Sequence, residues 1–348
     1  MRLVQVLFFA VVLFASSRAE AYPQFQFSTD NSRCSLCHFS PTGGGLINGW
    51  GRDEAADTIS RGGEGAFLHD AWEPPDWLAL GGDFRAAMGA HDTESDGIDP
   101  LLFPMQADLY SRFSFGDFSV STAVGLRGSA RPRDPPVHSR VASREHYVQW
   151  QPDSGKYLRA GRFYAPYGLR QVDHTNYIRR DLNYYAWEET YGLSGGLLED
   201  EWELHLTAYT RDPLLQVGDE GSGAVAMYEK RFRDDTAAWG LQSKVHLGPD
   251  SRQYWSGGTL KYWFESWDLL MLSELDLGLR TVDTSGADPI LGGIAHLNLT
   301  HFVTTGVMLG TTVELKHSDL SLRGKDAEAL SVTAQYFPRA HYEIMLMG

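Results

Sequence analysis

Apolar and polar residues alternate one by one along most of the chain from about residue 78 to its end. In residues 201–210, for example, Trp202, Leu204 and Leu206 are separated by charged or polar residues. A period of two places the two sets on opposite faces of a β-strand, and helical periodicity is absent from this part of the chain. The sequence therefore predicts a mainly β fold.

About 14 to 16 such alternating segments follow one another, roughly one every 17–20 residues. Short turns such as Gly116-Asp117 join some of them, and longer stretches such as 129–142 and 165–190 join others. Short turns on one rim and long loops on the other are typical of an outer-membrane barrel, whose strands need only ~9–11 residues to cross the membrane. We therefore predict that residues 78–348 form a transmembrane antiparallel β-barrel of about 14–16 strands.

Alternation alone does not separate a membrane barrel from a soluble β-sandwich or propeller, because strands in all three have one apolar face. The polar set includes Asp, Glu, Arg or Lys on nearly every segment, which a water-filled lumen accommodates. Tyrosine and tryptophan gather near segment ends, where the aromatic girdles of membrane barrels lie. These features favour the membrane barrel.

The start of the chain predicts export. A positively charged beginning precedes an apolar run over residues 3–15, and an A-x-A cleavage site ends at Ala21. We interpret residues 1–21 as a secretory signal peptide, with the mature chain beginning at Tyr22. Together with the predicted barrel, this places the protein in the cell outer membrane, with membrane lipid as a partner.

The charge of the chain excludes one class of partner. Its 45 acidic and 30 basic side chains give a formal net charge of −15. Cleavage of the signal peptide changes this to −16, because it removes Arg2, Arg18 and Glu20. Binding to phosphate backbones needs a basic face, so we expect no nucleic-acid partner.

Both cysteines of the chain lie in one short motif, Cys34-Ser35-Leu36-Cys37-His38. C-x-x-C-H is the attachment sequence of a c-type haem. Two intervening residues let both sulfurs reach the vinyl groups on one porphyrin edge, and the adjacent histidine is then placed to ligate the iron. A disulfide, a redox-active dithiol and part of a zinc site are the alternatives. We predict one covalent haem c, held by Cys34 and Cys37 with His38 as the proximal ligand.

Residues 22–77 form a separate N-terminal segment, interpreted as cytochrome c-like with a single haem. The sequence Glu73-Pro74-Pro75-Asp76 marks its boundary, because consecutive prolines interrupt regular structure. A segment this short has little core of its own. We therefore expect it to dock on the mouth or the lumen of the barrel.

The order of these parts resembles the fused cytochrome–porins of the bacterial outer membrane, known from iron-oxidising bacteria. The resemblance rests on the signal peptide, the CSLCH motif near the mature N-terminus, the downstream Gly51-Arg52 and the barrel that follows. It implies an electron-transfer protein that connects an extracellular donor or acceptor with periplasmic electron carriers. The chain lacks an evident metal-binding cluster for an external donor, so oxidoreductase activity towards a metal such as iron stays an open question.

Several further residues are candidates for the haem site. Arg52 is a candidate partner for a haem propionate, because arginine binds carboxylates in a bidentate fork. The iron's sixth ligand is not evident from the sequence, and the nearby candidates are His69, Met88, His91 and Met105. The stretch 165–190, rich in tyrosine and arginine, is expected to form an outer loop, with folding into the lumen as the alternative.

Two other functions remain open at this point. The first is a porin for solute diffusion whose N-terminal motif is a disulfide-bearing plug. The second is a soluble periplasmic β-protein that acts as a haem sensor.

Overall fold

The structure is a computed structural model that describes residues 25, 32–93, 97–126, 141–152, 154–171, 173–184, 189–210, 221–282 and 288–348. The predicted signal peptide lies outside the described residues. None of the described helices is long and apolar enough to span a membrane.

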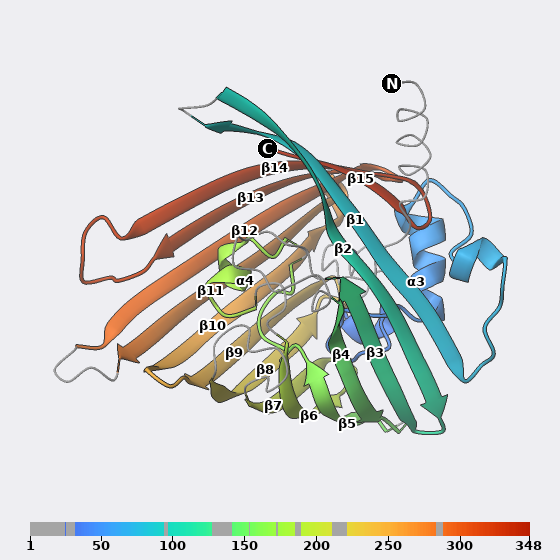
Figure 1. The fold of residues 1–348 in the computed structure, drawn as a ribbon, viewed down its shortest axis with the longest axis horizontal. Coiled ribbons are helices and arrows are strands. Elements are labelled where there is room, and N and C mark those ends of the chain that lie inside the picture. The colour runs from blue at the N-terminus through green and yellow to red at the C-terminus, as the bar shows by residue number, and fades with distance from the viewer. Residues whose placement is uncertain are drawn as a thin grey trace.

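Fifteen antiparallel strands form one sheet, in which each strand pairs with its neighbours in sequence order (Figure 1). This number agrees with the predicted 14–16. Among the described strands, β1 and β15 form the two edges and are not paired with each other, so the predicted closure of the barrel is not seen. The strands are β1 (Leu78–Thr93), β2 (Gly97–Phe115), β3 (Phe118–Leu126), β4 (Val141–Trp150), β5 (Lys156–Phe163), β6 (Thr190–Leu198), β7 (Trp202–Thr210), β8 (Ser222–Phe232), β9 (Ala237–Leu247), β10 (Ser251–Phe264), β11 (Leu269–Val282), β12 (Ile290–Thr304), β13 (Val307–His317), β14 (Asp326–Arg339) and β15 (Tyr342–Met347).

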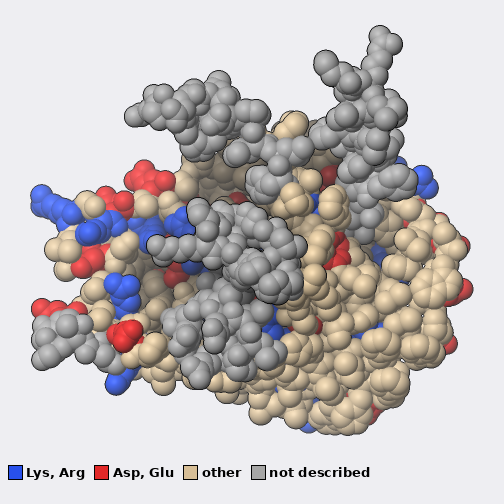
Figure 2. Space-filling view, in the orientation of Figure 1, with Lys and Arg blue, Asp and Glu red and all other residues tan. Residues whose placement is uncertain are grey.

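The sheet buries polar side chains and exposes apolar ones, the reverse of a soluble protein. On β7, Glu203, His205 and Thr207 are buried, whereas Leu206 between them is 54% exposed. Large apolar side chains are exposed in the same way on almost every strand. Figure 2 shows wide areas without charged residues, with Lys, Arg, Asp and Glu gathered mainly towards one end. A lipid-facing outer surface around a polar interior explains this pattern, and a soluble β-sandwich does not.

The N-terminal segment packs against the end of the sheet that carries the short turns (Figure 1). Its helical elements are α2 (Cys34–Cys37), α3 (Gly49–Glu54), a π-helical turn (Ala55–Ile59) and a 3-10 turn (Phe67–Asp70). The N–H of Arg61 donates to the carbonyl of Phe337 at 3.0 Å, and the N–H of Ala340 donates to the carbonyl of Gly62 at 2.9 Å. Leu46 packs against Tyr110 and Ala123 of the sheet. The segment therefore takes much of its core from the strands, as its small size predicts.

The long connection between β5 and β6 folds inward, and our expectation of an outer loop is wrong for its described part. It contains α4 (Tyr177–Arg180) and buries several tyrosines and leucines. The hydroxyl of Tyr167 donates to Asp276 at 2.7 Å, and the N–H of Leu169 donates to Glu274 at 2.6 Å. Carboxylates on the inner face of β11 thus accept hydrogen bonds from this loop and hold it inside the sheet.

Leu206 lies mid-strand on the outer face, and this placement can be tested by charge. We expect Leu206→Arg to reduce the free energy of unfolding in lipid by up to about 2–4 kcal/mol, the cost of arginine near the bilayer midplane. Leu320→Arg is the matched control, because Leu320 is an exposed leucine outside the strands. Urea unfolding in lipid vesicles, followed by heat-modifiable gel mobility, measures both. Equal losses in the two variants would contradict a lipid-facing β7.

Candidate functional site

The C-x-x-C-H motif forms a single helical turn followed by a compact loop. The N–H of His38 donates to the carbonyl of Cys34 at 3.0 Å, which closes α2. The chain then returns, and the N–H of Phe39 donates to the carbonyl of Leu46 at 3.2 Å. Asn48 caps α3 through the N–H of Gly51 and also donates to the carbonyl of Leu36 at 2.8 Å. This local network fixes both thiols and the imidazole on one short stretch.

Cys34, Cys37 and His38 all line one cavity inside the sheet. The N-terminal segment forms one side of this cavity. The inward loop from Tyr164 to Arg170 and the inner faces of β7, β8 and β10 form much of the rest. The turn between β14 and β15 closes the short-turn end with His341 and Tyr342. The cavity is thus shared between the small segment and the large sheet.

Burial controls the protonation of the motif. It raises the pKa of the Cys34 thiol to about 12 and that of the Cys37 thiol to about 11. Burial and, to a lesser extent, the nearby guanidinium of Arg170 together lower the pKa of His38 to about 4. Near neutral pH the site therefore presents two thiols and an uncharged imidazole, and the two thiols are not joined to each other. An uncharged imidazole is the form that ligates a metal.

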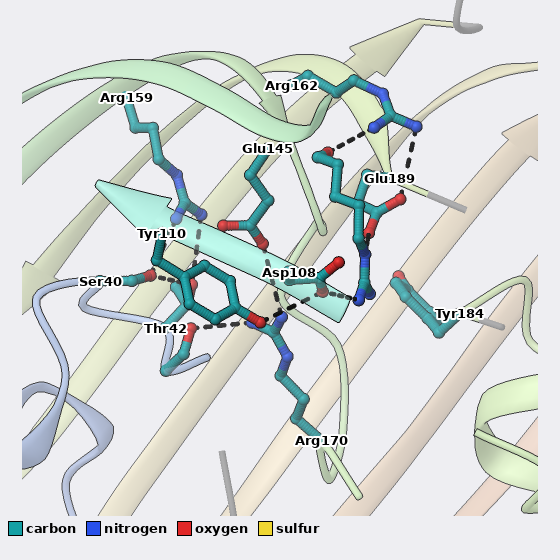
Figure 3. A network of polar contacts seen from close by, with 12 residues as sticks. Ser40, Thr42, Asp108, Tyr110, Glu145, Arg159, Arg162, Arg170, Tyr184 and Glu189 are labelled. Atoms are coloured by element: carbon teal, nitrogen blue, oxygen red, sulfur yellow. Dashed lines mark hydrogen bonds and ion pairs between the residues drawn. The ribbon is translucent and has the colours of Figure 1, made fainter. Parts of the chain in front are cut away.

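Arginines of the sheet and the inward loop hold the residues that follow the motif (Figure 3). Arg159 donates to the hydroxyls of Ser40 at 3.1 Å and Thr42 at 3.3 Å. Arg170 donates to the carbonyl of Gly43 at 2.8 Å. These contacts join the motif loop to β5 and to the inward loop, so the position of His38 depends on the barrel wall.

Behind these contacts lies a network of buried ion pairs (Figure 3). Arg144 contacts Asp108 at 2.8 Å and Glu189 at 2.9 Å, and Arg162 contacts Glu189 at 3.4 Å. Because buried charges are stable only when they are paired and hydrogen-bonded, this network fixes the wall that supports the motif loop.

A second charged group faces Cys34 from the sheet. Lys261 pairs with Glu229 at 2.7 Å, and Glu203 contacts Arg231 at 3.3 Å and His205 at 3.2 Å. Each carboxylate in this group has a cationic partner or an imidazole beside it. The part of the sheet that faces Cys34 is thus buried and polar, and its charged side chains pair with one another.

The residues present fit a covalent haem. Two thiols and a neutral imidazole line one cavity, and they are the donor set that attachment requires. Gly51 packs directly on the backbone of Cys37, where a Cβ atom would clash with the Cys37 carbonyl oxygen. This close approach is one reason for a glycine at that position.

The structure separates the other predicted residues from this cavity. Arg52 donates to the carbonyl of Leu80 at 2.7 Å and ties the segment to β1; it does not line the cavity, and its propionate role stays a prediction. His69 lies against His341, with ring centroids 4.7 Å apart, and is also outside the lining. Met88 and Met105 are 78% and 42% exposed on strands β1 and β2 and face away from the cavity. The side chain of His91 lies outside the described residues.

Sequence reasoning missed the lining residues that come from the strands and from the turn between β14 and β15. They include His205, Met227, Lys261 and His341. The parity of the alternation identifies which residues of a strand face inward, but it does not tell which strands lie next to the motif. That information resides in contacts between distant parts of the chain.

Comparisons with known proteins identify the fold. No protein-family model and no curated protein matches the sequence. The outer membrane channel DcaP of Acinetobacter baumannii superposes with a TM-score of 0.55 at 11% identity, over 78% of this chain and 89% of that one. OmpF of Salmonella typhi, solved in complex with daunomycin, superposes with a TM-score of 0.54 at 11% identity, over 75% and 86%.

The chain has a porin fold. This likeness agrees with the predicted barrel architecture and supports the predicted outer-membrane location. It concerns the fold alone and carries no information about the haem motif.

The contact between α3 and the motif can be tested with two glycines of the same helix. We expect Gly51→Ala to loosen the motif, because the added methyl group meets the Cys37 backbone. Gly49→Ala is the matched control, since no atom lies within 4 Å of its added methyl group. Replacing this glycine by alanine is expected to stabilise the helix by roughly 0.5–1 kcal/mol. Limited proteolysis, with cleavage sites between residues 32 and 77 located by mass spectrometry, compares the variants; equal protection would refute the importance of this contact.

Proposed function

We propose that this protein is an outer-membrane electron-transfer protein that carries one covalent haem c inside a porin-like barrel. The observation that carries the proposal is the opening of Cys34, Cys37 and His38 onto one lumenal cavity. A disulfide-bearing plug has no need of a cavity beside its cysteines. A soluble haem sensor does not account for the apolar outer surface.

Each part of the chain has a role in this function. The two thiols would hold the cofactor, and His38 would ligate its iron through a neutral imidazole. Bound haem c supplies reversible one-electron chemistry. Arg159 and Arg170 hold the motif loop in position, and the inward loop narrows access of water to the cavity. The apolar outer surface keeps this buried polar site within the membrane.

The two exchange partners would approach the barrel from opposite ends. In outer-membrane barrels the short turns face the periplasm. The N-terminal segment lies at that end, so a periplasmic carrier would exchange electrons close to residues 32–77. The extracellular donor or acceptor would approach through the long-loop side. Among the described residues no group of three or more His, Cys, Asp or Glu is arranged to hold a metal ion, so we propose no dedicated site for external iron.

Solute diffusion is the second candidate function, and the fold favours it. Both structural relatives are porin-like outer-membrane proteins, and one is named a channel. In this chain the motif loop of the N-terminal segment and the inward loop both lie against the inner face of the sheet. Diffusion would therefore depend on a narrow path between them.

A haem stain on denatured protein distinguishes the two functions. Covalent haem survives denaturation, so we expect the wild-type band to stain and the Cys34→Ser/Cys37→Ser double variant to lose the stain completely. Ser35→Ala, within the same motif, is the control and should retain it. An unstained wild type from cells that mature c-type cytochromes, together with ion conductance in a planar bilayer, would instead establish the diffusion channel.

A further inference from the structure

The cavity that receives the motif also offers a group for the other face of the haem iron. This inference rests on the proposed function and asks which lining side chain is chemically free to act as the second axial ligand. The side chains that ligate haem iron in proteins are imidazole, thiolate, thioether and phenolate. We therefore compared every described lining residue of these types, together with the lysine.

Two histidines besides His38 line the cavity, and the rings of both have polar contacts with other residues. His205 has Nδ1 at 3.0 Å from the hydroxyl of Tyr157 and Nε2 at 3.2 Å from Glu203. His341 places Nε2 at 3.0 Å from the carbonyl of Ala66, and its ring also interacts with the backbone of Glu64. Ligation by either ring would break contacts that hold the wall or the N-terminal segment.

Lys261 and the tyrosines of the cavity lining also take part in other interactions, which ligation of iron would break. Lys261 forms an ion pair with Glu229 at 2.7 Å, and a charged ammonium has no lone pair to donate. Tyr167 donates its proton to Asp276 at 2.7 Å. Tyr164 and Tyr184 take part in other polar or ring contacts, and Tyr342 stacks on His69 with centroids 5.9 Å apart.

Met227 is the one methionine among the described lining residues. It lies on β8, opposite His205 of β7 and Gln242 of β9, and has the same strand parity as the buried Glu229 and Arg231. Glu229, two residues further along, acts electrostatically on Cys34. The methionine is thus on the wall that faces the thiols.

The polar neighbours of Met227 already have partners. Glu203 contacts His205, Glu229 pairs with Lys261, and Gln242 donates to Glu274, whereas Val225 on the other side of Met227 belongs to a buried apolar cluster. The side chain of Met227 has no hydrogen bond or ring contact among the described residues and is not itself part of a buried apolar cluster. An apolar, polarisable side chain on a polar wall fits a soft metal centre and an apolar macrocycle.

We propose that Met227 is the second axial ligand of the haem iron, opposite His38. The cytochrome is then completed by the barrel wall, because its two axial ligands come from the N-terminal segment and from β8. Methionine–histidine ligation gives a higher reduction potential than ligation by two histidines. The chain would therefore exchange electrons with comparatively oxidising partners.

The test compares Met227→Leu with Met308→Leu in the full-length protein purified in detergent. Met308 is a buried methionine packed against Ile59 and Phe337, and it does not line the cavity. Intact mass first establishes that each protein carries one covalent haem. Visible absorption and near-infrared magnetic circular dichroism then report the axial ligands, and a redox titration reports the potential.

We expect wild type and Met308→Leu to show the charge-transfer signature of sulfur bound to ferric iron. Met227→Leu should keep its covalent haem but lose this signature, and Met227→His should remain six-coordinate with a lower potential. A haem-bearing Met227→Leu with an unchanged spectrum would overturn the ligand assignment while leaving the proposed function intact. A wild type without covalent haem would overturn the proposed function itself, so the two failures are distinguishable.

Discussion

Backbone hydrogen bonding in lipid is the constraint on which the rest of this structure depends. Every N–H and C=O within the hydrocarbon must be paired, and the antiparallel ladders provide those partners for β2 to β14 and for one side each of β1 and β15. Because the strand backbones are hydrogen-bonded to one another, the alternation of side chains along each strand decides which residues meet lipid and which face the interior. The outer positions are accordingly apolar, and the interior is free to hold charged and polar groups that a soluble core would not tolerate.

Contacts with the inner face of the sheet stabilise the N-terminal segment. The segment is too small to bury much apolar surface, and its clusters are completed by the sheet, through Leu46 against Tyr110 and Ile59 against Met308. Its motif loop is held by Arg159 and Arg170 as well as by hydrogen bonds within the segment. Neither part forms the cavity alone, which ties the chemistry proposed for the motif to the folding of the barrel.

Local patterns predicted the architecture because strand alternation and the C-x-x-C-H motif are local properties. Our strand number, inward parity and docking of the N-terminal segment all agree with the structure. The inward loop was missed because its acceptors, Asp276 and Glu274, lie 109 and 105 residues away from their donors in the sequence. Ligand candidates chosen for nearness in sequence, such as Met88, lie away from the cavity for a related reason. Met88 and Met105 lie on β1 and β2 with their side chains turned outward, and the sheet residues that line the cavity come from strands far along the chain.

The central claim is that a redox-active haem lies within a porin-like barrel, and one measurement tests it most directly. The intact, folded protein in detergent is titrated between oxidising and reducing potentials while its visible absorption is recorded. The account predicts one haem per chain, with the sharp absorption bands of a reduced c-type cytochrome appearing and disappearing reversibly in a single one-electron step. A folded, heat-modifiable barrel expressed with the cytochrome c maturation machinery, yet colourless at every potential with both thiols free, would contradict it.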